Sequence, residues 1–154
     1  MFKLDTHTTL LDSFRPKDRT LVELPSDLAF PLVVKDYLAW THPGGGRVFV
    51  VFATPGGVPT GIAFDTNGGG GMTSMCSWCH TPSVGTGVGL LVATLNGKKR
   101  VGVLVCTDLS CRDKLEQAAN LSGSSVRPAM EKLVARIGHF ASDALKIDLS
   151  GAGR

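Results

Sequence analysis

Two runs of apolar residues in the middle of the chain predict antiparallel hairpins. Residues 47–53, RVFVVFA, are dense in Val and Phe, which is typical of a buried strand, and residues 61–64, GIAF, predict its partner after a turn-rich connection. A second hairpin is predicted from residues 88–95 and 100–105, because the Asn-Gly pair between them tolerates the positive φ of a type I′ turn. The middle of the chain therefore predicts antiparallel β-structure.

Short helical patterns precede these hairpins. Residues 6–14 predict a first helix, which Pro16 is expected to end, and residues 16–25 predict a second short helix. Residues 26–43 have a mixed pattern that favours no single element. We assign four aromatic residues of this N-terminal part to the core: Phe2, Phe14, Tyr37 and Trp40.

Two helices are predicted after the hairpins. Residues 108–121 begin with Asp108, which suits an N-cap, and Gly123 suits the end of the helix. Residues 128–146 repeat apolar side chains at helical spacing, which predicts a long C-terminal helix with its apolar face on the core. The order of elements indicates an α+β fold.

Composition and charge narrow the class of protein. The chain has 154 residues, 43% of them hydrophobic and 19% charged, which is typical of one soluble globular domain. The net charge of +3 is compatible with an acidic protein or an RNA partner and diagnostic of neither. The start has no secretory pattern, and no apolar run approaches ~18 residues, so we expect a cytoplasmic protein with no membrane partner.

The four cysteines form two pairs around the second predicted hairpin. Cys76 and Cys79 are separated by two residues, which lets both thiolates of a knuckle point to one centre, and the hairpin returns Cys106 to the same place. The following helix is expected to present Cys111 from near its third position, toward the positive end of the helix dipole. Because a cytosol keeps thiols reduced, this order predicts one structural Zn²⁺ held by four thiolates.

Other interpretations of the cysteines have weaker support. The sequence CSWCH, 76–80, is also the attachment pattern of a c-type haem, but the chain lacks an export signal. A redox dithiol leaves the second pair unexplained, and four unrelated buried thiols remain an alternative. His80 is expected to be a loop side chain, and the glutamate of the zinc deaminase pattern is missing. We therefore expect no catalysis.

The cysteine motifs resemble those of the fusidic-acid-resistance, elongation-factor-G-binding proteins. The resemblance lies in CSWCHTPSVGTGVGLLVA and VGVLVCTDLSCRDKL, with YLAW followed by HP and a V-P-T-G-I strand upstream, and it covers roughly residues 5–145. It extends to the C-terminal treble-clef zinc-finger domain of that family. The best-known members also carry an N-terminal helical bundle, whereas this sequence starts almost directly in the zinc domain.

The resemblance implies a fold, a cofactor and a partner. It implies a treble-clef zinc finger with antiparallel β-hairpins, short N-terminal helices and a long C-terminal helix, in one domain over residues 1–154. Within it, 1–43 is a helical segment, 47–122 holds the hairpins and the zinc site, and 124–147 forms the last helix. It also implies that the protein binds elongation factor G and helps to free it from a ribosome stalled by fusidic acid. The protein itself is then expected to catalyse no reaction. The zinc ligands it implies are Cys76, Cys79, Cys106 and Cys111.

Several side chains are candidates for contact with a partner. Trp78 lies inside the knuckle, where it is either an exposed anchor or a core residue. The basic tip of the second hairpin is either a solvated turn or a surface that steers an acidic partner. Arg112 either extends this patch, with Lys114 and Arg127, or neutralises the zinc site. The candidates are Trp78, Lys98, Lys99, Arg100 and Arg112.

A zinc-stabilised RNA- or ribosome-binding module is the alternative function, because a tryptophan beside basic residues can stack on a base. Nucleotide binding is not expected. The run Gly85-x-Gly87-x-Gly89 is not the G-x-G-x-x-G pattern, and it leads into a predicted strand rather than a helix.

Overall fold

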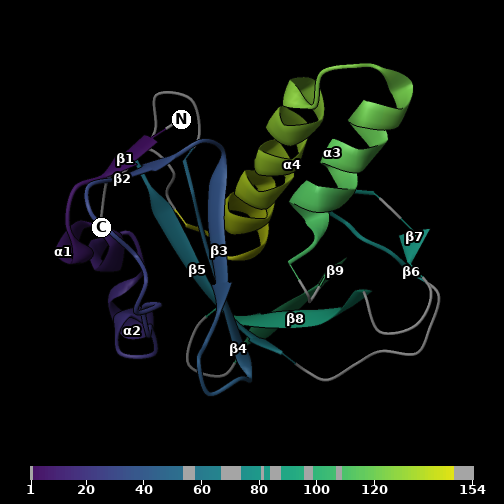
Figure 1. Cartoon of the computed structure of the whole chain (residues 1–154). Coiled ribbons are helices and arrows are strands. Elements are labelled where there is room, and N and C mark those ends of the chain that lie inside the picture. Colours follow the sequence, from purple (N-terminus) through teal and green to yellow (C-terminus); the bar gives the residue numbers. More distant parts are fainter. Residues whose placement is uncertain are drawn as a thin grey trace.

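A five-stranded antiparallel sheet forms the centre of the molecule (Figure 1). The computed structural model describes residues 2–53, 58–66, 74–80, 82–83, 88–95, 99–106 and 109–147. The strand order is β3-β4-β5-β8-β9. The strands are β3 (Tyr37–Thr41), β4 (Arg47–Phe52), β5 (Thr60–Thr66), β8 (Val88–Thr94) and β9 (Arg100–Cys106).

Both predicted hairpins are confirmed. Strands β4 and β5 pair along their length, from Arg47 opposite Asp65 to Phe52 opposite Thr60, and β8 pairs with β9 from Val88 opposite Cys106. The hairpins join through a ladder between β5 and β8, in which the described residues pair at two positions, the first of them Asp65 opposite Val92. The predicted Asn-Gly turn lies outside the described residues.

The N-terminal part contains strands as well as helices. Helices α1 (His7–Asp12) and α2 (Pro16–Arg19) confirm the two short helices, and the Thr6 hydroxyl caps α1 by accepting from the Thr9 N–H at 3.2 Å. Pro16 does not simply end the first helix, because it starts the second. Strands β1 (Phe2–Leu4) and β2 (Leu32–Val34) form a separate antiparallel pair. The description of residues 1–43 as helical is therefore incomplete.

The C-terminal helices lie together on one side of the sheet (Figure 1). Helix α3 (Cys111–Ser122) ends at Gly123, whose φ of 70° favours glycine, as predicted. Helix α4 (Arg127–His139) has Pro128 in its first turn and continues into the π-helical turn η1 (Phe140–Ala144). The predicted long C-terminal helix is thus confirmed, with a change of helix type in its last turn.

Two cores cover opposite faces of the sheet. Strand β4 shows this best, because Val48, Val50 and Phe52 face one core while Phe49 and Val51 face the other. The helix-side core adds buried residues of α4, η1, β8 and β9 and the four cysteines. The N-terminal core packs α1, β1, β2 and the residues after α1 onto β3–β5; it includes Leu4, Leu10, Phe14, Trp40 and Ala63.

The core assignments from the sequence are largely confirmed. Phe14, Tyr37 and Trp40 are buried, and Phe2 is half-buried against the N-terminal core. Because the sheet is covered on both faces at β3–β5, the apolar run of β4 has no polar alternation.

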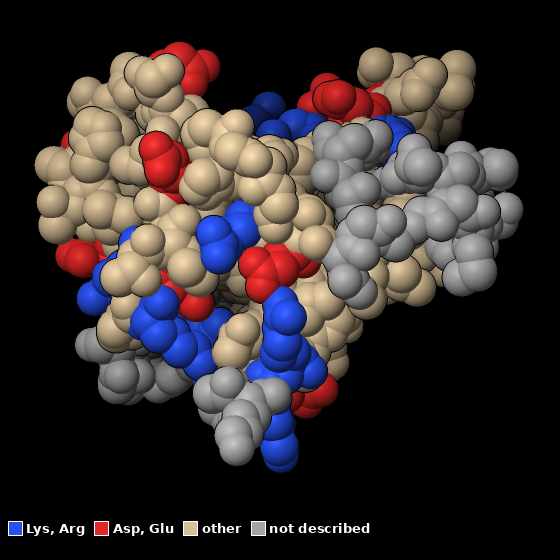
Figure 2. Space-filling view, turned by 90° about the horizontal axis from the view of Figure 1, so that it is seen from below, with Lys and Arg blue, Asp and Glu red and all other residues tan. Residues whose placement is uncertain are grey.

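Basic side chains gather on one face of the molecule (Figure 2). Seen from below the view of Figure 1, Lys and Arg side chains gather on the molecule with a few acidic side chains among them (Figure 2). No helix in the described part of the chain is both long enough and apolar enough to span a membrane. Large apolar side chains that are exposed in the described residues are few: Val33, Val58, Met75, Leu104 and Leu121.

Candidate metal centre

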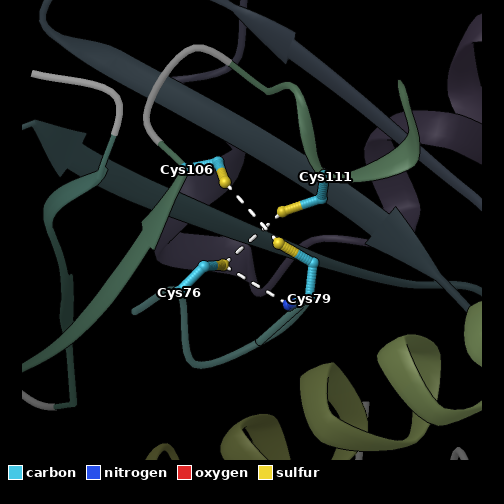
Figure 3. A group of neighbouring side chains, drawn as sticks. All are labelled: Cys76, Cys79, Cys106 and Cys111. Carbon is cyan, nitrogen blue, oxygen red and sulfur yellow. Dashed lines mark hydrogen bonds between the residues drawn. The ribbon is translucent and has the colours of Figure 1, made fainter. Parts of the chain in front are cut away.

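The four cysteines meet at one buried point (Figure 3). Their sulfur atoms all lie within 4.8 Å of one another, with 3.6 Å between Cys76 Sγ and Cys111 Sγ and 3.7 Å between Cys79 Sγ and Cys106 Sγ. All four thiols are free and buried. Three parts of the chain supply them: the turn after β6 (Ser74–Met75), the end of β9 and the start of α3.

The turn at residues 76–79 has the hydrogen bonds of a metal-binding knuckle. The backbone N–H groups of Trp78 and Cys79 both donate to Cys76 Sγ at 3.4 Å, and the His80 N–H donates to the Cys76 carbonyl at 2.9 Å. These donors favour a thiolate at Cys76. The Ser77 N–H also donates to the Leu104 carbonyl at 2.8 Å, which ties the turn to β9.

A tight connection brings the second pair together. The Leu109 N–H donates to the Cys106 carbonyl at 3.3 Å, and Leu109 has a φ of 61°, in the left-handed region. Cys111 is the first residue of α3, so the expectation that it lies near the third helical position is wrong. The predicted cap Asp108 lies outside the described residues, and Ser110 occupies the N-cap position. Cys111 still lies at the positive end of the helix dipole.

The donor set fits one Zn²⁺. A tetrahedron of thiolates about 2.3 Å from zinc has sulfur atoms about 3.8 Å apart, close to the two separations given above. Without a cation, hydrogen bonds from Cys106 and Cys111 lower the pKa of Cys76 to about 6. The same network, led by Cys106 and Cys76, raises the pKa of Cys111 far above its usual range. Four neighbouring sulfurs can all be thiolates only around a metal ion.

The basic residue beside the sulfurs is Lys114. Its Nζ donates to Cys106 Sγ at 3.2 Å. Arg112, which we expected either to neutralise the centre or to extend the basic patch, pairs with Asp36 and donates to the Tyr37 carbonyl at 2.6 Å. Its guanidinium also lies 4.5 Å from the centre of the Tyr37 ring. Arg112 therefore anchors α3 to the start of β3.

The remaining partner candidates are dispersed. Trp78 is only 7% exposed and its ring lies 5.8 Å from that of Phe64, so the core interpretation holds and the exposed-anchor interpretation does not. Lys98 lies outside the described residues. Lys99 and Arg100 are exposed at the start of β9, and Arg100 pairs with Asp65. The structure therefore keeps Trp78 beside the sulfurs as a core residue, whereas Lys99 and Arg100 lie at the opposite end of β9 from Cys106.

A groove beside the knuckle was not anticipated from the sequence. It has a volume of about 560 Å³ and lies between the knuckle, β9 and α4, where Trp78, Val103 and Phe140 contribute apolar walls. Arg136 crosses it and donates to the Trp78 carbonyl at 2.5 Å. His80 is exposed at its rim and is not one of the four clustered donors. The groove is lined by segments that are remote in sequence, namely the knuckle, β9, α4 and η1, so no local motif predicts it.

Comparisons with known proteins agree with this geometry. A structure of the fusidic acid resistance protein FusC is similar in fold, with a TM-score of 0.51 and 16% sequence identity. The match covers 73% of this chain and 50% of that one, so this chain spans about half the length of FusC. Comparison with curated proteins finds no match. The family model described as the FBP C-terminal treble-clef zinc-finger matches residues 7–144, and the chain belongs to that family.

Proposed function

We propose that Cys76, Cys79, Cys106 and Cys111 bind one structural Zn²⁺, and that the protein is a non-catalytic module that binds elongation factor G. The family match over residues 7–144 is the observation that carries this proposal. A four-thiolate site has no open position for a catalytic water, which supports a structural role for the metal. The similarity in fold to a fusidic acid resistance protein supports translation as the process involved.

The metal organises the surface that we assign to the factor. It joins the knuckle, the end of β9 and the start of α3, and structural zinc sites contribute on the order of 10 kcal/mol of apparent free energy. Met75 is 56% exposed immediately before the knuckle, and Leu104, 43% exposed, is tied to the knuckle through its carbonyl. We call Met75, Leu104 and the adjoining groove the knuckle surface.

The chemistry of the knuckle surface suits a protein partner. Protein interfaces have an apolar centre that is surrounded by polar groups. Here Met75 and Leu104 are exposed near the knuckle, Met75 directly before it and Leu104 through its backbone contact with Ser77. The groove adds apolar walls, and Arg136 and His80 add polar groups to its lining. Flexible methionine side chains adapt well to a partner.

The mechanism that we propose is a shift of population. The factor has a conformation that is stalled on the ribosome and one that leaves it. If the module binds the second conformation more tightly than the first, it favours release to the extent of that difference in affinity. This function places the protein in the cytoplasm, where translation takes place.

Binding of purified elongation factor G by calorimetry tests the proposal. We expect micromolar or tighter binding, and Met75→Asp and Leu104→Asp are each expected to weaken it by about 30-fold or more, because a carboxylate in an apolar interface costs about 2 kcal/mol or more. Leu121→Asp is the matched control, since Leu121 is 85% exposed at the end of α3, away from the knuckle.

Zinc content is measured for every variant, so that loss of the fold is distinguished from loss of contact. Two results would contradict the proposal. One is wild-type protein that holds zinc and shows no heat or retention with the factor at low salt. The other is that the Met75→Asp and Leu104→Asp variants bind the factor as tightly as the Leu121→Asp control. That result would place the interface on another surface.

A further inference from the structure

A set of basic side chains lies at the end of the sheet opposite the metal. It combines α2 with the start of β4 and β9, and we call it the basic face; its members are Lys17, Arg19, Arg47, Lys99 and Arg100. Figure 2 shows Lys and Arg side chains gathered on the side of the molecule seen from below. Strand β9 begins in this face and ends at Cys106, which separates the basic face from the metal by about 20 Å.

Direct contacts hold the parts of the basic face together. The Lys17 Nζ donates to the Leu95 carbonyl at 2.9 Å, which fastens α2 to the end of β8 across 78 positions of sequence. The Leu95 N–H in turn donates to the Lys99 carbonyl at 2.8 Å. Residues that are remote in sequence are therefore fixed side by side, and the sequence alone indicated only the hairpin tip.

One carboxylate positions the two arginines of the sheet. Asp65 on β5 pairs with Arg100, and its other oxygen lies 3.3 Å from Arg47 Nε. Two guanidinium groups share a single carboxylate, so one positive charge remains uncompensated in this trio. All three side chains are 39–50% exposed, which leaves donors available to a ligand in solvent.

Two other cations of the basic face, Lys17 and Arg19, are held by backbone carbonyls, which do not neutralise them. Lys17 donates to a carbonyl as described, and Arg19 donates to the carbonyls of Phe14 at 3.1 Å and Asp12 at 3.2 Å. With the carboxylates of Asp12 and Asp65 included, the basic face carries a charge of +3. For comparison, the whole chain carries a net charge of +3.

We propose that the basic face binds the phosphate backbone of a nucleic acid. None of the exposed large apolar side chains in the described residues belongs to it; Leu104, which shares β9, lies four residues from Arg100, about 13 Å. A protein interface needs an apolar centre, whereas a nucleic-acid interface is polar and strongly positive. The inference goes beyond the binding of elongation factor G, and it uses a different surface.

The test uses zinc-loaded protein and a fluorescein-labelled single-stranded RNA of mixed sequence, about 20 nucleotides long. Each phosphate contact adds about −0.7 to the slope of log K against log salt for a single strand, so five contacts predict a slope near −3.5. The double variant Lys17→Ala/Lys99→Ala removes two contacts. We expect it to reduce the slope by about 1.4 and to weaken binding by about tenfold or more at low salt.

Two matched variants make the test specific. Lys35→Ala/Lys132→Ala removes two exposed lysines outside the basic face and changes net charge equally; it is expected to leave binding within about twofold. Lys17→Arg/Lys99→Arg keeps the charge and is expected to retain binding. Duplex DNA of the same length is run in parallel to distinguish the kind of nucleic acid.

Three results would overturn the inference. The first is no RNA or DNA binding at about 50 mM salt. The second is an equal loss of affinity in the two double alanine variants, which would indicate diffuse attraction. The third is binding of poly-glutamate but not of nucleic acid, which would assign the face to an acidic protein. Elongation factor G binding is unaffected by any of these results, so the two proposals fail separately.

Discussion

The helix-side core and the N-terminal core lie on opposite faces of the same strands but are held by different interactions. Phe14, Trp40 and Phe49 pack ring against ring in the N-terminal core, with centroids 5.4–6.2 Å apart. On the helix side, a knuckle, a strand end and a helix start are held through four sulfurs. One face is therefore closed by apolar packing, and the other depends in addition on a metal.

The proposed binding surface and the metal lie on the same side of the sheet. Burial in the N-terminal core involves no metal, whereas we expect the knuckle to lose its order when the metal is removed. The surface that we assign to the factor lies on the metal-dependent side. Each core holds one of the two tryptophans, Trp40 on the N-terminal side and Trp78 on the helix side, so the two regions can be followed independently.

The largest effect is expected from removal of a zinc ligand. Cys106→Ser should abolish stoichiometric zinc and remove on the order of 10 kcal/mol of apparent stabilisation, so that the hairpin–helix unit β8–β9–α3 unfolds. In a Trp40→Phe background, the emission of Trp78 reports this unfolding. With Trp78→Phe instead, Trp40 should stay shielded from a quencher. Simultaneous loss of both signals on chelation would show that the two cores are one cooperative unit.

The next largest effect is expected in the N-terminal core. Phe49 is fully buried between Phe14 and Trp40, so Phe49→Ala should lower the free energy of unfolding by about 3–5 kcal/mol. Urea denaturation measures the loss. If the variant is folded in the absence of urea, its zinc stoichiometry should equal that of the wild type. Zinc loss from such a folded variant would contradict the separation of the two regions.

A smaller effect is expected where the backbone of β5 meets the N-terminal core. A Cβ added at Gly61 would lie 2.7 Å from the Phe14 ring, and the Gly61 N–H donates to the Ser13 carbonyl at 2.8 Å. Gly61→Ala should therefore displace the ring and cost about 1–3 kcal/mol. Gly102→Ala is the comparison, since its Cβ would meet only the flexible end of Leu90. Equal losses in the two variants would refute the close packing at Phe14.

The smallest effect is expected from the hydrogen bond between Lys114 and the sulfur of Cys106. Lys114→Met removes the ammonium group 3.2 Å from Cys106 Sγ and should weaken zinc retention by about 1 kcal/mol, because a partly exposed charged contact contributes modestly. Competition with a chromogenic chelator measures this change, and Lys114→Arg should restore part of it. If Arg112→Met weakens zinc retention more than Lys114→Met does, Lys114 is not the important cation.

The hairpins and the cysteine cluster were predictable because their signals are local. Val-rich runs around a turn determine β8 and β9, and a two-residue spacing determines the knuckle. The four thiols then meet because the hairpin has a fixed length and α3 starts directly after it. Sequence reasoning placed Cys111 two positions too deep in the helix, because the helix start depends on the turn at Leu109 rather than on a capping residue.

Features that arise from remote contacts were not predictable. Strand β2 is Leu-Val-Val, only three residues long, and it pairs with β1 at the other end of the N-terminal segment, so its pattern is too short to predict a strand. Burial of Trp78 depends on Phe64 and on α4, which lie far from the knuckle in sequence. The basic face likewise required Lys17 and Leu95 to meet.

X-ray absorption at the zinc edge of the purified protein is the decisive test that four thiolates hold one Zn²⁺. We expect one zinc per chain, surrounded by four sulfur atoms at about 2.3 Å and by no nitrogen or oxygen ligand. A protein that contains no zinc, or a shell in which a histidine nitrogen replaces a sulfur, would contradict it.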